Sequence, residues 1–234
     1  MRRAGEMVGA IALVVAGMFC VPASAHASSS ATRALRAAAR RTLAAPNVRA
    51  TGTTSGAPRS FEDYIAPDRV RIGGPSSIGG PPTESRIIGS VGYTQQHCNG
   101  VTSWTRQEIS HPATASPNAA TAEFLIGRAT DVRLVAHGKH GDRYTFTIPP
   151  RTTDGGARLE WRDASAVVAR GMLREFAFTA RTTYQGRTTG GKGRIRFSHF
   201  GTVPPIEAPP ADEVTDGPQL CAAPITGTSV PSIH

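Results

Sequence analysis

The sequence predicts an α+β fold that is mostly β, with one antiparallel sheet, a helix at the N-terminus and one or two helices that cover the apolar face of the sheet. Three observations lead to this prediction. Apolar and polar residues alternate with a period of two over most of the chain after residue 46, Gly-rich turns separate the alternating runs, and helical patterns occupy only two short segments. Period-two alternation buries one face of each strand and leaves the other wet, which is typical of antiparallel sheets.

The first 27 residues read as a cleavable secretory signal peptide. Positive charge comes first, at Arg2 and Arg3, and an apolar stretch follows over residues 8–21. That stretch is shorter than the ~20 apolar residues of a membrane-spanning helix. The motifs Ala-Ser-Ala at 23–25 and Ala-His-Ala at 25–27 both fit the small-residue rule for cleavage. We therefore expect an exported protein, secreted or held in the cell envelope, that is cut near residue 25 or 27.

Two other interpretations of the leader remain open. It could stay uncleaved as an anchor helix, or Cys20 could carry a lipid. Lipid attachment generally requires a small residue directly before the cysteine, and Phe19 occupies that place. The sequence therefore favours an unlipidated mature chain.

The mature chain of about 207 residues is long enough for one domain with a real core. Removal of Arg2, Arg3 and Glu6 takes the net charge from +9 to +8. Most of the basic residues are arginines spread along the chain, which is typical of a solvated face but also fits attraction to an anionic membrane or cell-wall surface. Export and the lack of a stacking motif argue against nucleic acid as a partner. We expect a monomer.

Two cysteines remain after cleavage, Cys98 and Cys221. An even pair outside the cytoplasm predicts a disulfide, although free thiols or a bridge between chains remain alternatives. Cys98 directly precedes Asn99-Gly100, the strongest hairpin signal in the chain, so we expect it at a hairpin tip. His97 is adjacent to Cys98 and no other ligand stands at zinc spacing, so no metal site is predicted.

Two segments are predicted to be helical. Residues 31–45 are rich in Ala and Arg and end at a proline. The second helix is expected over residues 119–130, with Phe124, Leu125 and Ala129 on its apolar side.

The apolar members of the alternating runs are expected to share one face of the sheet. Two short helices are too few to cover that face completely, so part of it should line a cavity for an apolar ligand. The alternative is that side chains fill this space. The expected lining residues are Ile87, Val91, Tyr93, Val132, Leu134, Tyr144, Phe146, Ile148, Phe176, Phe178, Ile195 and Phe197.

No catalytic or cofactor-binding motif emerges. Residues 186–193 approach the P-loop pattern, but Gly193 stands where Ser or Thr must bind magnesium, and the alternation that follows predicts a strand rather than a helix. His137 and His140 flank a hairpin turn, where solvated histidines are expected. Glu62 and Asp63 are adjacent, so they should point to opposite faces of a strand. We predict no cofactor and no enzymatic activity.

Four phrases of the chain are informative in their order. They are FEDYIAPDRVR (61–71), IIGSVGYT (87–94), FLIGRATDV (124–132) followed by GDRYTF (141–146), and FSHFGTVPPIEAPP (197–210). In this order they resemble the LolA-like and LppX/LprG-type lipid and lipoprotein carriers. The resemblance covers roughly residues 31–214 and is carried by the order of the phrases.

The resemblance implies an open half-barrel, a strongly curved antiparallel sheet with helices across its concave face and a cavity for acyl chains. This chain departs from the LppX/LprG pattern because it lacks the lipobox and carries a cysteine pair.

Taken together, the sequence predicts a signal peptide (1–27), a half-barrel domain (28–208) and a Pro/Gly-rich tail (209–234). The function that we expect is carriage or binding of a lipid or other apolar molecule in the cell envelope, without catalysis. Two alternatives remain open. The chain could be a structural module that engages envelope partners, or a secreted hydrolase whose catalytic residues meet only in space.

Overall fold

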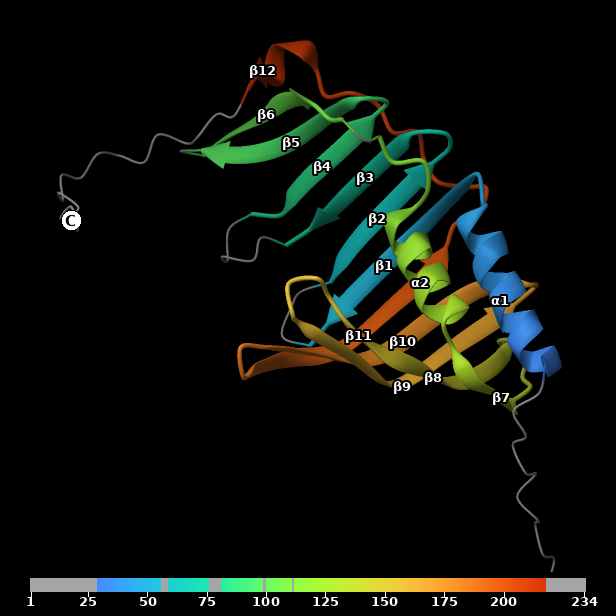
Figure 1. Ribbon diagram of the computed structural model, residues 1–234. Coiled ribbons are helices and arrows are strands. Elements are labelled where there is room, and N and C mark those ends of the chain that lie inside the picture. The colour runs from blue at the N-terminus through green and yellow to red at the C-terminus, as the bar shows by residue number, and fades with distance from the viewer. Residues whose placement is uncertain (1–28, 56–58, 76–80, 99, 111, 218–234) are drawn as a thin grey trace, which may run out of the picture.

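The computed structural model describes residues 29–55, 59–75, 81–98, 100–110 and 112–217. In this part of the chain, twelve strands form one sheet with the order β12-β6-β5-β4-β3-β2-β1-β11-β10-β9-β8-β7, and two α-helices accompany it (Figure 1). The helices are α1 (Ser29–Leu43) and α2 (Pro117–Gly127). The strands are β1 (Asn47–Thr54), β2 (Ser60–Ile65), β3 (Arg69–Gly74), β4 (Thr83–Ile88), β5 (Val91–Cys98), β6 (Val101–Glu108), β7 (Thr130–Ala136), β8 (Asp142–Thr152), β9 (Arg158–Ala169), β10 (Met172–Tyr184), β11 (Arg187–Ser198) and β12 (Val214–Asp216).

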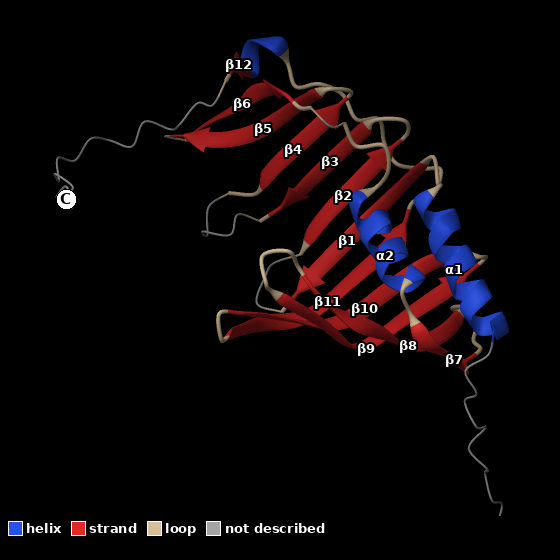
Figure 2. Ribbon diagram, viewed as in Figure 1, coloured by secondary structure: helices blue, strands red, loops and turns tan. Residues whose placement is uncertain are grey.

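The sheet curves into two arms that meet at β1 and β2, and both helices lie inside the curve (Figures 1 and 2). Strands β2 to β6 form one arm, and β11 to β7 form the other. The edge strands β7 and β12 do not pair with each other, so the barrel stays open. This architecture confirms the predicted α+β fold and the predicted open half-barrel.

All neighbouring strands pair antiparallel except β12, which runs parallel to β6. The fold therefore continues past residue 208, where the composition predicted a tail to begin. Between β11 and β12 the chain crosses the outer face of the first arm, and Ile206 on this segment is buried. The segment is held there because Arg69 Nη1 donates to the Ile206 carbonyl at 2.8 Å, and Arg86 Nη1 donates to the Glu207 carbonyl at 2.8 Å.

Both predicted helices are present. The second begins at Pro117 because Ser116 caps it, with its Oγ accepting a hydrogen bond from the Ala119 amide at 3.1 Å. The prediction that Phe124 faces the core is wrong, since 45% of its surface is exposed. The inward positions of α2 are Ala119, Ala122, Leu125 and Ile126, and helical spacing turns Phe124 away from them.

The hydrophobic core lies between the helices and the inner face of the sheet. Small residues on α1, among them Ala38 and Ala39, allow α1 to approach α2 and the sheet closely. The fully buried side chains Leu35, Leu173 and Phe176 fill the centre of this layer. Burial of such side chains contributes about 1.5–3 kcal/mol each to the free energy of unfolding.

Two expectations fall partly or wholly outside the described residues. The predicted signal peptide is one. The other is the disulfide, because Cys221 is not described, although Cys98 does end β5 at the tip of the β5–β6 hairpin. Within the described ranges, no helix is both long enough and apolar enough to cross a membrane.

Candidate ligand-binding site

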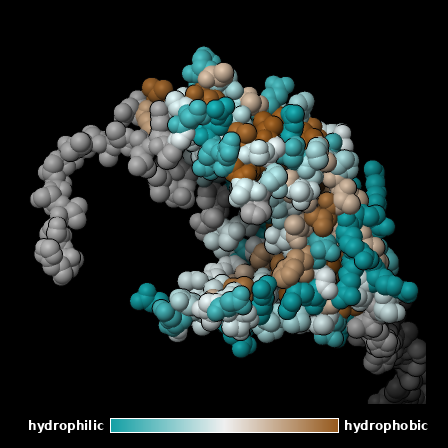
Figure 3. All heavy atoms as spheres, turned by 45° about the horizontal axis from the view of Figure 1, so that its top comes forward, coloured by the Kyte–Doolittle hydropathy of each residue, from teal (hydrophilic) through white to brown (hydrophobic). Residues whose placement is uncertain are grey.

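The helices cover only one end of the strands that cross the inner face. In β11, Ile195 and Phe197 near the C-terminal end are buried, whereas the four residues from Arg187 to Gly190 are exposed. Strands β8 and β10 show the same gradient from a buried end to an exposed end. The space-filling view shows the hollow that opens between the two arms of the sheet beyond the helices (Figure 3). We call this uncovered part of the inner face the mouth.

Most of the twelve residues predicted to share one face do lie on the inner face. Strand register and the core packing place ten of them there: Ile87, Val132, Leu134, Tyr144, Phe146, Ile148, Phe176, Phe178, Ile195 and Phe197. Of these, Val132, Tyr144, Phe146, Ile148, Phe176, Ile195 and Phe197 are packed in the core. Their role as the lining of a ligand cavity stays a prediction.

Val91 and Tyr93 lie on the opposite face, so the prediction that they share a face with Ile87 is wrong. Tyr93 pairs with Arg86, and Ile87 pairs with Gly92. The cause is a two-residue hairpin turn at Gly89, whose φ of 62° is in the left-handed region. Because this turn splits the segment into β4 and β5, alternation counted through it assigns β5 to the wrong face.

The floor of the mouth is made of residues with little or no side chain. The glycines at 52, 74, 191 and 193, together with Ser60, all occupy inner-face register positions on four different strands. The ring of Phe178 takes the space over Gly193, so the depression in the sheet surface lies at the neighbouring small residues Gly52, Ser60 and Gly74. No signal in the linear sequence groups these glycines, because only the strand pairing brings them together.

Apolar side chains stand on both arms around this floor. Ile72 on β3 is 41% exposed although it shares the inner face with the buried Val70. On the other arm, Phe178 and Trp161 are partly buried against the edge of the core. An isolated exposed Ile needs no explanation, but Ile72 shares a concave face with these two partly buried aromatic side chains.

A pocket of about 300 Å³ lies where the first turn of α2 overhangs the floor. Gly52, Ser60 and Gly193 line its sheet side, together with Phe178 and Ile195. Asn118 and Thr121 of α2 line the other side. The mouth therefore combines a floor of small residues, apolar walls and a few polar groups from the helix.

Glu62 fixes the end of α2 that borders this pocket. The carboxylate of Glu62 is buried on the inner face, where it accepts hydrogen bonds from the Ser116 hydroxyl, from the Asn118 amide at 3.1 Å and from Asn118 Nδ2 at 2.6 Å. Burial raises the pKa of Glu62 above its ordinary value, although these hydrogen bonds oppose the rise. The sequence predicted that Glu62 and Asp63 take opposite faces, but it gave no sign of this contact with α2.

The residues weighed for chemistry lie at separate places in the described part of the structure. The segment that approaches the P-loop pattern is part of the strand β11, as predicted. His137 is largely exposed, and its Nδ1 lies 2.8 Å from Asp142 Oδ1. Over the described residues, no group of three or more His, Cys, Asp or Glu side chains could hold a metal ion.

Comparisons with known proteins found similar structures but no matching family model or curated protein. Among solved structures, the chain is similar to LprF from Mycobacterium bovis, with 14% identity and a TM-score of 0.47 over 79% of this chain and 98% of that one. It is also similar to the LolA superfamily protein NE2245 from Nitrosomonas europaea, with 12% identity and a TM-score of 0.27 over 72% of this chain and 91% of that one. The fold assignment therefore rests on the sheet and helices of the chain itself.

Proposed function

We propose that this chain is an exported, non-catalytic carrier that binds a lipid or another apolar molecule in the mouth of its half-barrel. One observation carries the proposal. The inner face is covered by helices at one end only, and its uncovered part has a floor of small residues between the exposed Ile72 on one arm and the partly buried Phe178 and Trp161 on the other. Such a floor accepts a narrow flexible chain, which is the shape of an acyl tail.

The polar groups at the pocket suit the other end of such a ligand. At the edge of the pocket of about 300 Å³, Asn118 and Thr121 offer side-chain oxygens as acceptors, because Asn118 Nδ2 donates to Glu62 and the Thr121 hydroxyl donates to the Pro117 carbonyl. A ligand with one apolar end and one polar end could place its chain on the glycine floor and its polar end near α2. Ligand sites of this kind have mostly apolar walls and a few placed polar groups.

The direct test is mass spectrometry of organic extracts from the exported protein, with native mass spectrometry to give the ratio of ligand to protein. We expect an apolar molecule bound at about one per chain. The proposal would be wrong if the folded protein carries none and also fails to bind fatty acids or phospholipids that are added to it.

A matched pair of variants locates the site. Gly52→Leu places a side chain on the floor, where a Cβ would lie 3.4 Å from Ser60 Oγ, an ordinary contact. Thr51→Leu adds a similar side chain to the preceding residue, which faces outward and does not line the pocket. Loss of ligand in Gly52→Leu and retention in Thr51→Leu are expected. Equal retention in both variants would place the ligand elsewhere. Turnover of a panel of ester and glycoside substrates by the wild type would instead favour a hydrolase.

A further inference from the structure

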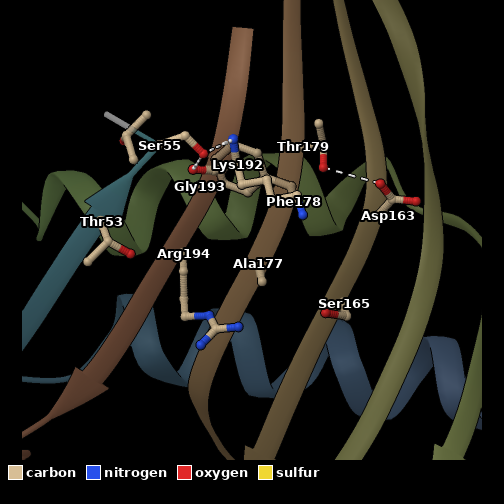
Figure 4. A pocket seen from close by; sticks show the side chains of 11 residues that line it. Thr53, Ser55, Asp163, Ser165, Ala177, Phe178, Thr179, Lys192, Gly193 and Arg194 are labelled. Atoms are coloured by element: carbon tan, nitrogen blue, oxygen red, sulfur yellow. Dashed lines mark hydrogen bonds between the residues drawn. The ribbon is translucent and has the colours of Figure 1, made fainter. Parts of the chain in front are cut away.

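The outer face of the second arm carries hollows that the inner-face site does not use. One of about 570 Å³ is lined by Ala177 and Ser165 and by the basic residues Lys192 and Arg194 (Figure 4). In Figure 4 both helices lie behind the strands, which places these side chains on the face turned away from the core. A second hollow of about 600 Å³ adjoins Glu175 and Arg196 on the same face.

Strand register organises this face into rows. In one row Arg196 of β11 pairs with Glu175 of β10, which pairs with Val167 of β9, which pairs with Arg143 of β8. In the next row Arg194 pairs with Ala177, and Ala177 pairs with Ser165. Each row therefore has a long basic side chain on β11 and shorter side chains on β10 and β9.

The exposed residues Lys192, Arg194 and Arg196 are spaced two apart along β11, so they form a ridge with a cation every ~6.6–6.8 Å. Arg59 lies beside Arg194 and Arg196 around a smaller hollow of about 110 Å³. Arg143 on β8 is also exposed, and β10 and β9 lie between it and this ridge. We call the depression between this ridge and Arg143 the outer trough.

Cations outnumber carboxylates in the outer trough. Together with a neighbouring hollow of about 610 Å³ beside Arg143, these hollows are lined by seven Arg or Lys side chains and three carboxylates: Arg59, Arg133, Arg143, Arg174, Lys192, Arg194 and Arg196 against Asp131, Asp163 and Glu175. Glu175 neutralises part of the ridge, since its oxygens lie 2.9 Å from Arg196 Nε and 3.6 Å from Arg194 Nε. Both arginines still have about half of their side-chain surface exposed, so they can reach a ligand.

We propose that the outer trough is a second binding site and that it takes a linear phosphodiester polymer lying along β10 and β11. Guanidinium groups bind phosphate oxygens through paired, charge-assisted hydrogen bonds. The hydroxyls of Thr53 and Ser165 stand in the same rows and can donate to further oxygens. A regular series of cations suits a chain with repeated charges, and a floor set below its ridge suits a narrow chain better than a flat membrane surface.

Glu175 provides the sharpest test, because it lies in the trough and opposes the proposed ligand. The probe is fluorescently labelled poly(glycerol phosphate), with binding followed by anisotropy. Neutralising the ridge in the double variant Arg194→Gln/Arg196→Gln should weaken binding on the order of 10-fold. Glu175→Gln frees two arginines and should strengthen binding roughly three-fold. Both effects should shrink as salt is raised.

The matched control is Arg33→Gln/Arg40→Gln, which removes the same charge from exposed positions on α1. It should change the affinity by less than about two-fold, because these charges are remote from the trough and screened by salt. If the ridge variant has a lowered thermal midpoint, Lys192→Gln/Arg143→Gln tests the same trough without removing a partner of Glu175.

Three results would overturn the proposal. The first is equal weakening by the control and ridge variants, which would indicate a response to net charge alone. The second is unchanged or weaker binding by Glu175→Gln. The third is tighter binding of polygalacturonate or of phosphatidylglycerol vesicles than of poly(glycerol phosphate). The proposal does not depend on the inner-face ligand, and the ridge variants should keep the same co-purified apolar molecule as the wild type.

Discussion

Glu62 and Asp63 are consecutive residues of β2, and both side chains are buried, on opposite faces of the sheet. On the inner face, Glu62 accepts hydrogen bonds from the first turn of α2. On the outer face, Asp63 accepts a pair of bonds from Arg49, with distances of 2.6 Å for Nε to Oδ1 and 2.8 Å for Nη2 to Oδ2. Arg71 adds a bond from Nη2 to Asp63 Oδ2 at 2.5 Å. One dipeptide therefore joins a helix to the sheet and joins three strands to one another.

We expect Asp63→Asn to lower the free energy of unfolding by about 2–3 kcal/mol at neutral pH, because it leaves two guanidinium groups without their shared carboxylate. Both arginines are partly exposed, which keeps the expected loss below that of a fully buried pair. Urea unfolding measures the change. Asp216→Asn is the control, since it breaks an ion pair of the same type with Arg106 at a largely exposed site. Similar midpoints for the two variants would contradict a structural role for Asp63.

The contribution of Asp63 should also be visible in the pH dependence of stability. Burial raises the pKa of this carboxyl, but the hydrogen bonds and charges of Arg49 and Arg71 outweigh burial and hold it below its ordinary value of 3.8. A depressed pKa gives stability that is present above the unfolded value and is lost as the pH falls through the folded value. The wild type should therefore lose stability below about pH 3.8. Asp63→Asn should lose less over the same range, as measured by thermal unfolding.

The contribution of Glu62 to stability should depend on pH in the opposite direction. The folded pKa of Glu62 is raised by burial, so its contribution is fully present below the ordinary value of 4.5 and is lost as the pH rises through the folded value. Glu62→Gln should remove this loss. At neutral pH, however, it should lower the free energy of unfolding by about 1–3 kcal/mol, because the amide of Gln faces three donors.

Hydrogen exchange gives a local reading of the Glu62 prediction. Amides in the first turn of α2, from Asn118 to Thr121, should exchange faster in Glu62→Gln than in the wild type. Glu123→Gln changes a carboxyl of the same helix that is not part of this contact, and it should leave their exchange unchanged. Faster exchange in both variants would point to general weakening of α2.

The sequence predicted the fold best where alternation is uninterrupted. Strand β8, for example, keeps Tyr144, Phe146 and Ile148 on one face, as expected. Strand β9 could not be predicted in this way, because Asp163 has a positive φ of 52° and interrupts the pairing with β10. The inner face passes from Trp161 to Ala164 at that point, so the period of two is broken.

The site was less predictable than the fold, for a related reason. A residue such as Phe178 is recognisable as an inward apolar residue from its own strand. The glycine floor and the Glu62 contact depend on partners more than 50 residues away, and nothing local indicates them. Alternation predicted which residues face inward but not how far the helices extend over them, which is what separates core residues from the mouth.

Gly193 tests the packing at the boundary between the core and the mouth. A Cβ at this position would lie 2.7 Å from Cζ of Phe178, so the ring must move. We expect Gly193→Ala to lower the free energy of unfolding by about 1–3 kcal/mol. Gly127→Ala, at the end of α2, meets nothing within 4 Å and should raise it by about 0.5–1 kcal/mol. Chemical denaturation of both variants checks the sign of each change in the free energy of unfolding. If Gly193→Ala does not lower it, the ring of Phe178 can move aside without cost.

We expect Cys98 and Cys221 to form a disulfide in the exported protein. Cys98 ends β5 at a hairpin tip on the open side of the first arm, and the C-terminal segment leaves the sheet at β12 on the neighbouring edge. A bridge would tie the last residues of the chain to this hairpin and would enclose a loop of over 100 residues. For a loop of that length the chain-entropy model gives a stabilisation of roughly 4–5 kcal/mol as an upper figure.

Peptide mapping of the exported protein without reductant should recover a cross-linked pair of fragments, and reductant should lower the thermal midpoint. Cys98→Ser/Cys221→Ser should have the same lowered midpoint with and without reductant. Two alkylatable thiols in the exported wild type would refute the bond.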